Sequence, residues 1–177
     1  MANEYASARP YFDESLAMKR ALEDRWGIGA TLVSLARTAQ EDGDAEAAKA
    51  LAAESLQIFE ELGDRESLAA VLESIADLAL TDEMPARALR LRAAAEALRE
   101  AIGSPLPPNH YAWRDRTVTD AEEILGQPEA SAATDAGRQL SQEAPSPRHS
   151  RFSAQPIGAT RPDVTAAKRS VLACAWL

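Results

Sequence analysis

Glu14–Ala36 reads ESLAMKRALEDRWGIGATLVSLA, and forty positions later Glu54–Ala76 reads ESLQIFEELGDRESLAAVLESIA. The two stretches align without a gap, and the identical residues of the first copy are Glu14, Ser15, Leu16, Leu22, Asp24, Arg25, Ala30, Leu32, Ser34 and Ala36. A third, partial copy has the same offset, since Ala88, Leu91, Ala93, Ile102 and Gly103 correspond to Ala48, Leu51, Ala53, Leu62 and Gly63. A repeat of this period predicts structural units that stack on one another.

Each copy is predicted to form two amphipathic helices. Apolar residues recur at spacings of three and four, as one face of a helix requires, at Ile28, Leu32, Leu35 and Ala39. Gly43 can adopt the left-handed conformation that ends a helix, and Asp44 and Asp64 can cap the helices that follow. Pro85 fits a first helical turn, where amides have no intrahelical partner. The pattern predicts helices at about 10–23, 27–41, 45–62, 65–80 and 85–102.

The composition agrees with an all-α fold. Aromatic residues make up 5% of the chain although 46% of it is apolar, so Ala and Leu, both strong helix formers, dominate. The net charge is −9, and from Glu143 onward five basic residues stand against two acidic ones, which leaves about −12 on residues 1–142. Such an acidic body repels a phosphate backbone, so nucleic acid is not an expected partner.

The chain has one cysteine, Cys174, which cannot form an internal disulfide, so a reducing, cytoplasmic location is expected. Its first residues, MANEYASARPYFDES, have no basic start before an apolar run, unlike a signal peptide. The sequence also lacks an apolar stretch of about 18 residues, and no membrane interaction is predicted.

These residues resemble the tetratricopeptide repeat (TPR) family at Leu35-Ala36, Gly43-Asp44, Ala48 and Ser55-Leu56. The forty-residue version, with LGDR between units, is similar to the C-terminal TPR arrays of bacterial LuxR-type and SARP-type regulators and related signalling ATPases. Ala93–Pro108, AAAEALREAIGSPLPP, resembles the end of such arrays, and Ala136–Ser141 resembles their closing turn. The resemblance covers residues 5 to about 142, is weak after 127, and implies a right-handed α-solenoid of antiparallel helix pairs with a capping helix at 109–126.

The implied function is a protein-protein interaction or signal-sensing scaffold, a TPR portion of a bacterial regulator without its ATPase and DNA-binding modules. No GxxxxGK[ST] phosphate loop is present, and Trp26-Gly27-Ile28-Gly29 has no following Lys. We therefore expect no enzyme activity and no cofactor. His110 and His149 lack a second ligand at metal spacing, so no metal site is predicted either.

By the resemblance, the first helix of each pair lines a concave groove that binds a protein or peptide segment. The groove positions lie off the core stripe of two helices and are Val33, Arg37, Gln40, Glu73, Asp77 and Leu80. The alternative is that these side chains form an ordinary solvated helix face.

Four arginines on one predicted helix, at positions 87, 90, 92 and 99, have two interpretations. They form a patch for phosphate or an acidic partner, or they pair with Glu96, Glu100 and the acidic neighbouring helices. The second is favoured, and exposed pairs of this kind stabilise a fold little.

The two ends of the chain lead to separate expectations. The helix at 10–23 resembles the second half of a pair, so its outer face is either exposed or covered by residues 1–9; an exposed face suggests homo-oligomerisation, with self-assembly as the alternative function. Tyr111 and Trp113 are expected to pack the capping helix over Leu98 and Ile102. Residues 1–142 form the predicted repeat domain, and 143–177, interrupted by prolines, a mostly disordered tail.

Overall fold

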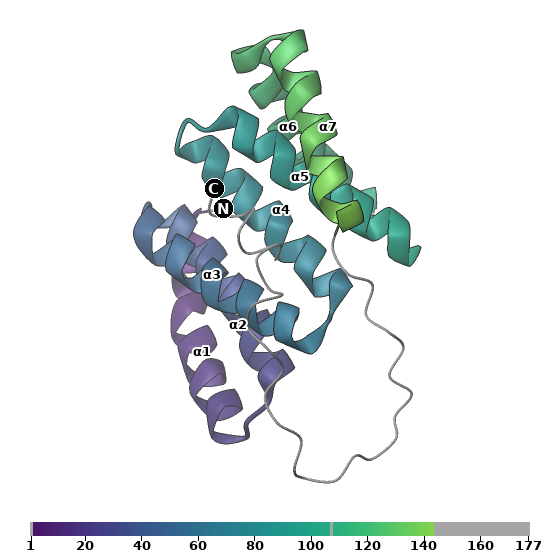
Figure 1. The fold of residues 1–177 in the computed structure, drawn as a ribbon. Helices are drawn as coiled ribbons and strands as arrows, with labels where there is room; N and C mark the ends of the chain where they lie inside the picture. The colour runs from purple at the N-terminus through teal and green to yellow at the C-terminus, as the bar shows by residue number, and fades with distance from the viewer. Residues whose placement is uncertain (1, 107, 144–177) are drawn as a thin grey trace, which may run out of the picture.

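The computed structural model describes residues 2–106 and 108–143, and within them seven α-helices and no β-strand occur, so the predicted all-α class is confirmed. The helices are α1 (Ala2–Ala21), α2 (Arg25–Glu41), α3 (Ala45–Leu62), α4 (Arg65–Thr81), α5 (Pro85–Ile102), α6 (Tyr111–Leu125) and α7 (Gln127–Glu143), with a 3-10 turn at Pro108–His110. Helices that follow one another in sequence pack together, and the array runs from α1 at one end to α6 and α7 at the other (Figure 1).

Two elements differ from the sequence-based expectation. Helix α1 begins at Ala2 instead of near residue 10 and continues through Pro10, although a proline removes one hydrogen bond of the helix. Helix α7 was not predicted, and the expected closing turn at Ala136–Ser141 is helical. The tail expected at 143–177 lies, apart from the backbone of Glu143, outside the described residues.

One turn geometry ends each of the helices α1 to α5 and recurs every twenty residues. A residue with φ between 55° and 79° lies at Glu23, Gly43, Gly63, Glu83 and Gly103. After α2, the amide of Asp44 donates to the carbonyl of Ala39 at 2.8 Å and that of Gly43 donates to Gln40 at 3.0 Å. This pair of bonds is the Schellman motif, and equivalent pairs occur at the other four turns. The chain therefore reverses direction in the same way each time.

At the ends of α1, α2 and α3, the residue after the left-handed one is the N-cap of the next helix. The carboxylates of Asp24, Asp44 and Asp64 accept hydrogen bonds from amides in the first turns of α2, α3 and α4. Helix α5 has no such side-chain cap and instead has Pro85 in its first turn. The predicted roles of Gly43, Asp44, Asp64 and Pro85 are thus confirmed.

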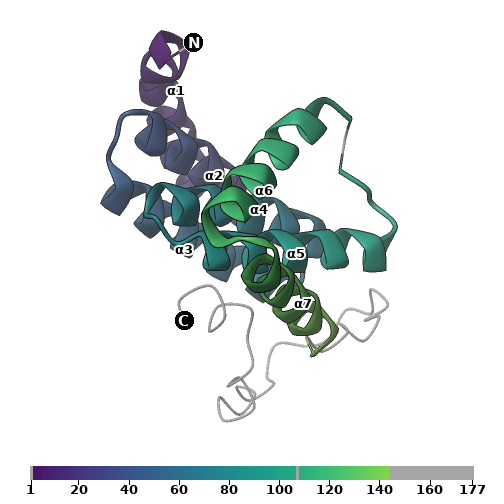
Figure 2. The same cartoon turned by 90° about the horizontal axis from the view of Figure 1, so that it is seen from above.

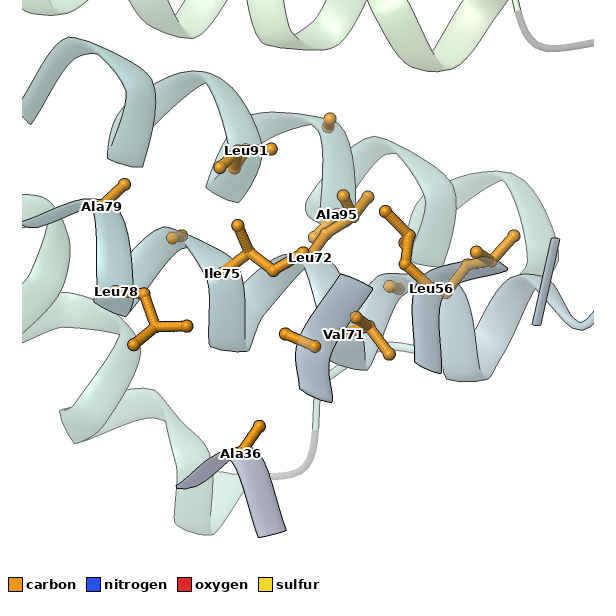
Figure 3. Close-up of a cluster of buried hydrophobic side chains, with 14 of the residues drawn as sticks. Ala36, Leu56, Val71, Leu72, Ile75, Leu78, Ala79, Leu91 and Ala95 are labelled. Carbon is orange, nitrogen blue, oxygen red and sulfur yellow. The ribbon is translucent and has the colours of Figure 1, made fainter. Parts of the chain in front are cut away.

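Small residues in the core let the helices approach closely. Several core alanines are at most 2% exposed, among them Ala36, Ala48, Ala52, Ala76, Ala79, Ala88 and Ala95. Larger side chains fill the space between them, and Figure 3 shows Leu72 and Ile75 of α4 beside Leu91 and Ala95 of α5. Phe59 is 1% exposed and lies against Gly29 of α2, where a Cβ atom would be only 2.8 Å from the ring.

Helix α7 packs closely along α5 at the end of the array (Figure 2). A Cβ atom at Gly137 would lie 2.2 Å from the carbonyl oxygen of Arg90, so only glycine permits this approach. A small apolar cluster of Leu89, Ala121, Ala130 and Ala133 joins α5, α6 and α7. Both α6 and α7 therefore cover α5, in place of the single capping helix expected from the sequence.

Asp64 does more than cap α4, because it also binds α2. Its carboxylate accepts hydrogen bonds from the indole of Trp26 at 2.9 Å and from the hydroxyl of Ser67 at 2.6 Å. Burial acts to raise the pKa of Asp64, but the hydrogen bonds from Ser67 and Trp26 outweigh it, and the pKa lies below its usual 3.8. A carboxylate with a lowered folded-state pKa stabilises the fold above its unfolded pKa.

We predict that Asp64→Ala lowers the free energy of unfolding by about 1–2 kcal/mol, and the matched cap variant Asp44→Ala by about 1 kcal/mol. The difference arises because Asp44 lacks the indole and hydroxyl contacts in the described structure. Urea unfolding measures both. The excess cost of Asp64→Ala should shrink as the pH falls from about 4, the unfolded-state pKa, through the lower folded-state pKa of Asp64. Equal costs at neutral pH, or an excess unchanged by acid, would contradict this assignment.

Candidate functional site

Helix α4 lies at the centre of the array and carries the two predicted groove carboxylates. It contacts α2, α3, α5 and α6. The Glu73 side chain is 6% exposed and that of Asp77 is 16% exposed. Neither carboxylate is an ordinary solvated group, and each is bound by an arginine of α5.

Glu73 and Arg99 form a buried, two-pronged ion pair. Nε and Nη2 of Arg99 donate to the two carboxylate oxygens of Glu73 at 2.7 and 3.2 Å. Paired geometry of this kind is the strongest form of a side-chain ion pair. Both charges are taken out of water, which costs several kcal/mol per ion and is offset only by good geometry.

The forty-residue offset shows what this ion pair replaces. Position 73 corresponds to Val33 of α2, and position 99 corresponds to Phe59 of α3. Val33 is packed against the main core, and Phe59 is one of its most buried side chains. The α4–α5 pair therefore carries two opposite charges where the α2–α3 pair has two apolar side chains.

Asp77 is the centre of a second network that joins three helices. Nη2 of Arg92 on α5 lies 3.1 Å from its Oδ1, and the hydroxyl of Thr117 on α6 donates to the same oxygen at 2.8 Å. Burial raises the pKa of Asp77, while the charges of Arg92 and Arg37 and the Thr117 hydrogen bond oppose that rise. Burial likewise lowers the pKa of Arg92.

Two of the predicted groove residues, Arg37 and Asp77, occupy equivalent repeat positions with Thr117 on α2, α4 and α6. Arg37, Asp77 and Thr117 are spaced by forty residues, and Arg37 is close enough to Asp77 to lower its pKa. Gln40 is half-buried, and Val33 and Leu80 are half-buried against the core. Thr117 was missed by the sequence analysis, although extending the forty-residue offset past Gly103 would have indicated it.

A cavity of about 360 Å³ lies between α5 and α6, next to these ion pairs. Its charged lining comes from Glu73, Arg92, Glu96, Arg99, Glu100 and Arg114. Gly103, Pro105, Leu106 and Tyr111 complete the wall. The sequence analysis assigned no role to Leu106 or Arg114. The cavity becomes visible only when the segment between α5 and α6 is placed in space.

Arg92 and Arg99 of α5 pair with acidic residues, which is the second interpretation given for the four arginines. Both pair with carboxylates of the neighbouring α4. Glu96, which was expected to pair within α5, lies 3.5 Å from Arg138 of α7 instead. A surface patch of four arginines is therefore not what the helix presents.

Three large apolar side chains are exposed on α1 and in the turn directly after it. Tyr11, Met18 and Leu22 are 74%, 59% and 76% exposed. Their spacing of seven and four residues places them on one side of the helix. Tyr111, expected to help cover the end of the array, is 40% exposed, and the side chain of Trp113 is not among those described.

No helix in the described part of the chain has the length and apolar character needed to cross a membrane. Within residues 2–106 and 108–143, the structure also contains no group of three or more His, Cys, Asp or Glu side chains arranged to hold a metal ion. His149 and Cys174 lie outside these residues.

Comparison with known proteins gives no relative for this chain. No family model matches it, and none of the curated proteins or solved structures is significantly similar to it. The chemistry and geometry of its own residues therefore carry the functional argument.

We predict opposite outcomes for breaking and for replacing the buried ion pair. Glu73→Gln should lower the free energy of unfolding by about 3–5 kcal/mol, because it leaves the buried charge of Arg99 uncompensated. The double variant Glu73→Val/Arg99→Phe copies the apolar pair of α2 and α3 and should be neutral, or more stable by about 1–4 kcal/mol.

Urea unfolding of the full chain, followed by circular dichroism, measures both variants. A double variant as unstable as Glu73→Gln would show that the two positions are not equivalent to Val33 and Phe59.

Proposed function

We propose that the chain is a right-handed α-solenoid of TPR-like antiparallel helix pairs, and that it binds a protein or peptide segment as an interaction or signal-sensing scaffold. The observation that supports this most is the row of Arg37, Asp77 and Thr117, which repeats one position on three successive alternate helices. The recurrence of one turn every twenty residues, at the ends of α1 to α5, also fits a stacked repeat.

The row offers a partner both polar and apolar contacts. Arg37 and Gln40 are half-buried and provide hydrogen-bond donors, and Val33 and Leu80 provide apolar surface beside them. Asp77 is engaged by Arg92 and Thr117, so its role is to orient Arg37 and not to bind the partner itself. An extended or helical segment with an acceptor opposite Arg37 matches this surface.

In this proposal the chain carries out no catalysis and belongs to a cytoplasmic regulatory system. The sequence contains no phosphate-binding loop, and the acidic charge of residues 1–142 disfavours direct contact with nucleic acid. The proposed role, by the resemblance at Leu35-Ala36, Gly43-Asp44 and Ala93–Pro108, is that of the TPR portion of a bacterial regulator.

A peptide library displayed on phage and selected on the full chain tests the binding function. We expect the selected peptides to lose affinity by about tenfold or more for Arg37→Gln, because a desolvated guanidinium–acceptor contact is worth about 1.5–3 kcal/mol. Arg116→Gln on the exposed surface of α6 is the matched control and should leave affinity unchanged. Selection that yields no binder, or binders indifferent to Arg37→Gln, would remove the groove assignment.

A second candidate function, self-assembly, is supported by the apolar stripe of Tyr11, Met18 and Leu22 on α1. Such a stripe can pack against its copy on a second chain. Sedimentation velocity over a range of concentrations tests this. Met18→Glu should abolish association, whereas Ala17→Glu, on a different side of the same helix, should not. A wild-type chain that stays monomeric at high concentration would exclude self-assembly.

A further inference from the structure

We propose that the cavity between α5 and α6 binds a carboxylate attached to an apolar group, with Arg114 and Arg92 facing the carboxylate and Leu106 and Tyr111 contacting the apolar part. The site is distinct from the Arg37 row, and the proposal does not depend on peptide binding there. Glu73, one of the predicted groove residues, also lines this cavity.

The size and walls of the cavity suit a small ligand. Its volume of about 360 Å³ lies in the lower part of the range of about 300–1,000 Å³ that ligand pockets occupy. Pro105, Leu106 and the ring of Tyr111 line it together with the aliphatic stems of the arginines. Such a wall buries an apolar body, and the few charged groups set its orientation.

Three of the six charged residues that line the cavity are buried. Glu73 and Arg92 are each 5% exposed and Arg99 is 8% exposed. The positions forty residues before the two arginines are Ala52 and Phe59, both in the apolar core. Core stability does not require charges here, because apolar residues fill the equivalent space in the preceding helix pair.

The electrostatics of the cavity favour an anion near Arg92 and Arg114. Burial is the main cause that lowers the pKa of Arg92; the nearby charge of Arg114 acts in the same direction, and the charges of Asp77 and Glu73 oppose both. Arg99 already neutralises Glu73, so the buried end of the cavity carries no free negative charge from that pair. A carboxylate between Arg92 and Arg114 relieves their repulsion.

Arg114 is able to change partners at little cost. It binds Asp115, its sequence neighbour, whose side chain is 60% exposed, and an exposed pair of this kind is worth at most about 1 kcal/mol. Its guanidinium also lies 4.9 Å from the centre of the Tyr111 ring, which holds it at the cavity wall. A ligand carboxylate can therefore replace Asp115 without loss of the ring contact.

The lining also contains acidic residues, so a cationic ligand is the alternative to a carboxylate. Glu96 lies 3.5 Å from Arg138, and Glu100 is exposed. Neither is desolvated as strongly as Arg92, so an ammonium group gains less from them than a carboxylate gains from the two arginines.

Isothermal titration calorimetry of the full chain with three matched probes tests the proposal: 3-phenylpropanoate, 3-phenylpropan-1-ol and 3-phenylpropylamine. We expect saturable binding of the acid, with the alcohol and the amine about tenfold weaker or more. Equal binding of the three probes, stronger binding of the amine, or no binding of the acid at millimolar concentration would overturn the proposal.

Variants locate the site and check that the fold is intact. Arg114→Gln should weaken binding of the acid about tenfold or more, whereas Arg116→Gln on the same helix should leave it unchanged. Arg114 is half-buried and Arg116 is exposed, and neither substitution should shift the unfolding transition appreciably. An Arg114→Gln chain that is folded and binds the acid normally would overturn the assignment to this cavity.

Two further probes separate the possible sources of the carboxylate. Acetyl-Leu-Phe with a free carboxyl terminus and its C-terminal amide are titrated in the same way. Tighter binding of the peptide acid than of 3-phenylpropanoate assigns the site to a peptide terminus, and weaker binding assigns it to a free organic acid. A peptide amide that binds as well as the peptide acid counts against the proposal.

Discussion

The position of α5 along α4 depends on how the two carboxylates of α4 are neutralised. Four helices pack around α4, so Glu73 and Asp77 lose most of their contact with water. Arg99 and Arg92 of α5 supply the opposite charges, and their bonds fix α5 along α4 at two points about two turns apart. An apolar interface would permit small shifts of one helix along the other, whereas two directional ion pairs specify a single register.

The same ion pairs connect the two surfaces to which we assign binding roles. Asp77 receives Thr117 of α6 on one side and is close to Arg37 of α2 on the other, so three alternate helices meet at one carboxylate. Arg99 and Arg92 also line the cavity on the α5 side. Arg92 therefore both lines the cavity and pairs with Asp77.

Much of the fold followed from local sequence rules. The capping roles of Gly43, Asp44 and Asp64 depend on residues within a few positions of one another, and the forty-residue offset identified the core alanines. Helix α7 was missed because its sequence, QPEASAATDAGRQLSQE, has few large apolar residues, and its contact with α5 depends on the small size of Gly137. Glu73 was assigned to the groove by the resemblance, because it lies off the core stripe. In the structure it is buried against Arg99, twenty-six residues away, and no local sequence pattern indicates such a partner.

The uniform turn has a consequence for how such a chain can change in length. Because Glu23, Gly43, Gly63, Glu83 and Gly103 are evenly spaced and similar in geometry, a unit of forty residues begins and ends at equivalent backbone positions. Duplicating or deleting one such unit in the gene would join compatible helix ends, and each new neighbour would present a related set of small residues. Polarity is the exception: a copy of the α4–α5 unit carries its charges with it, so each duplication of that unit would add another pair of internal charges to the protein.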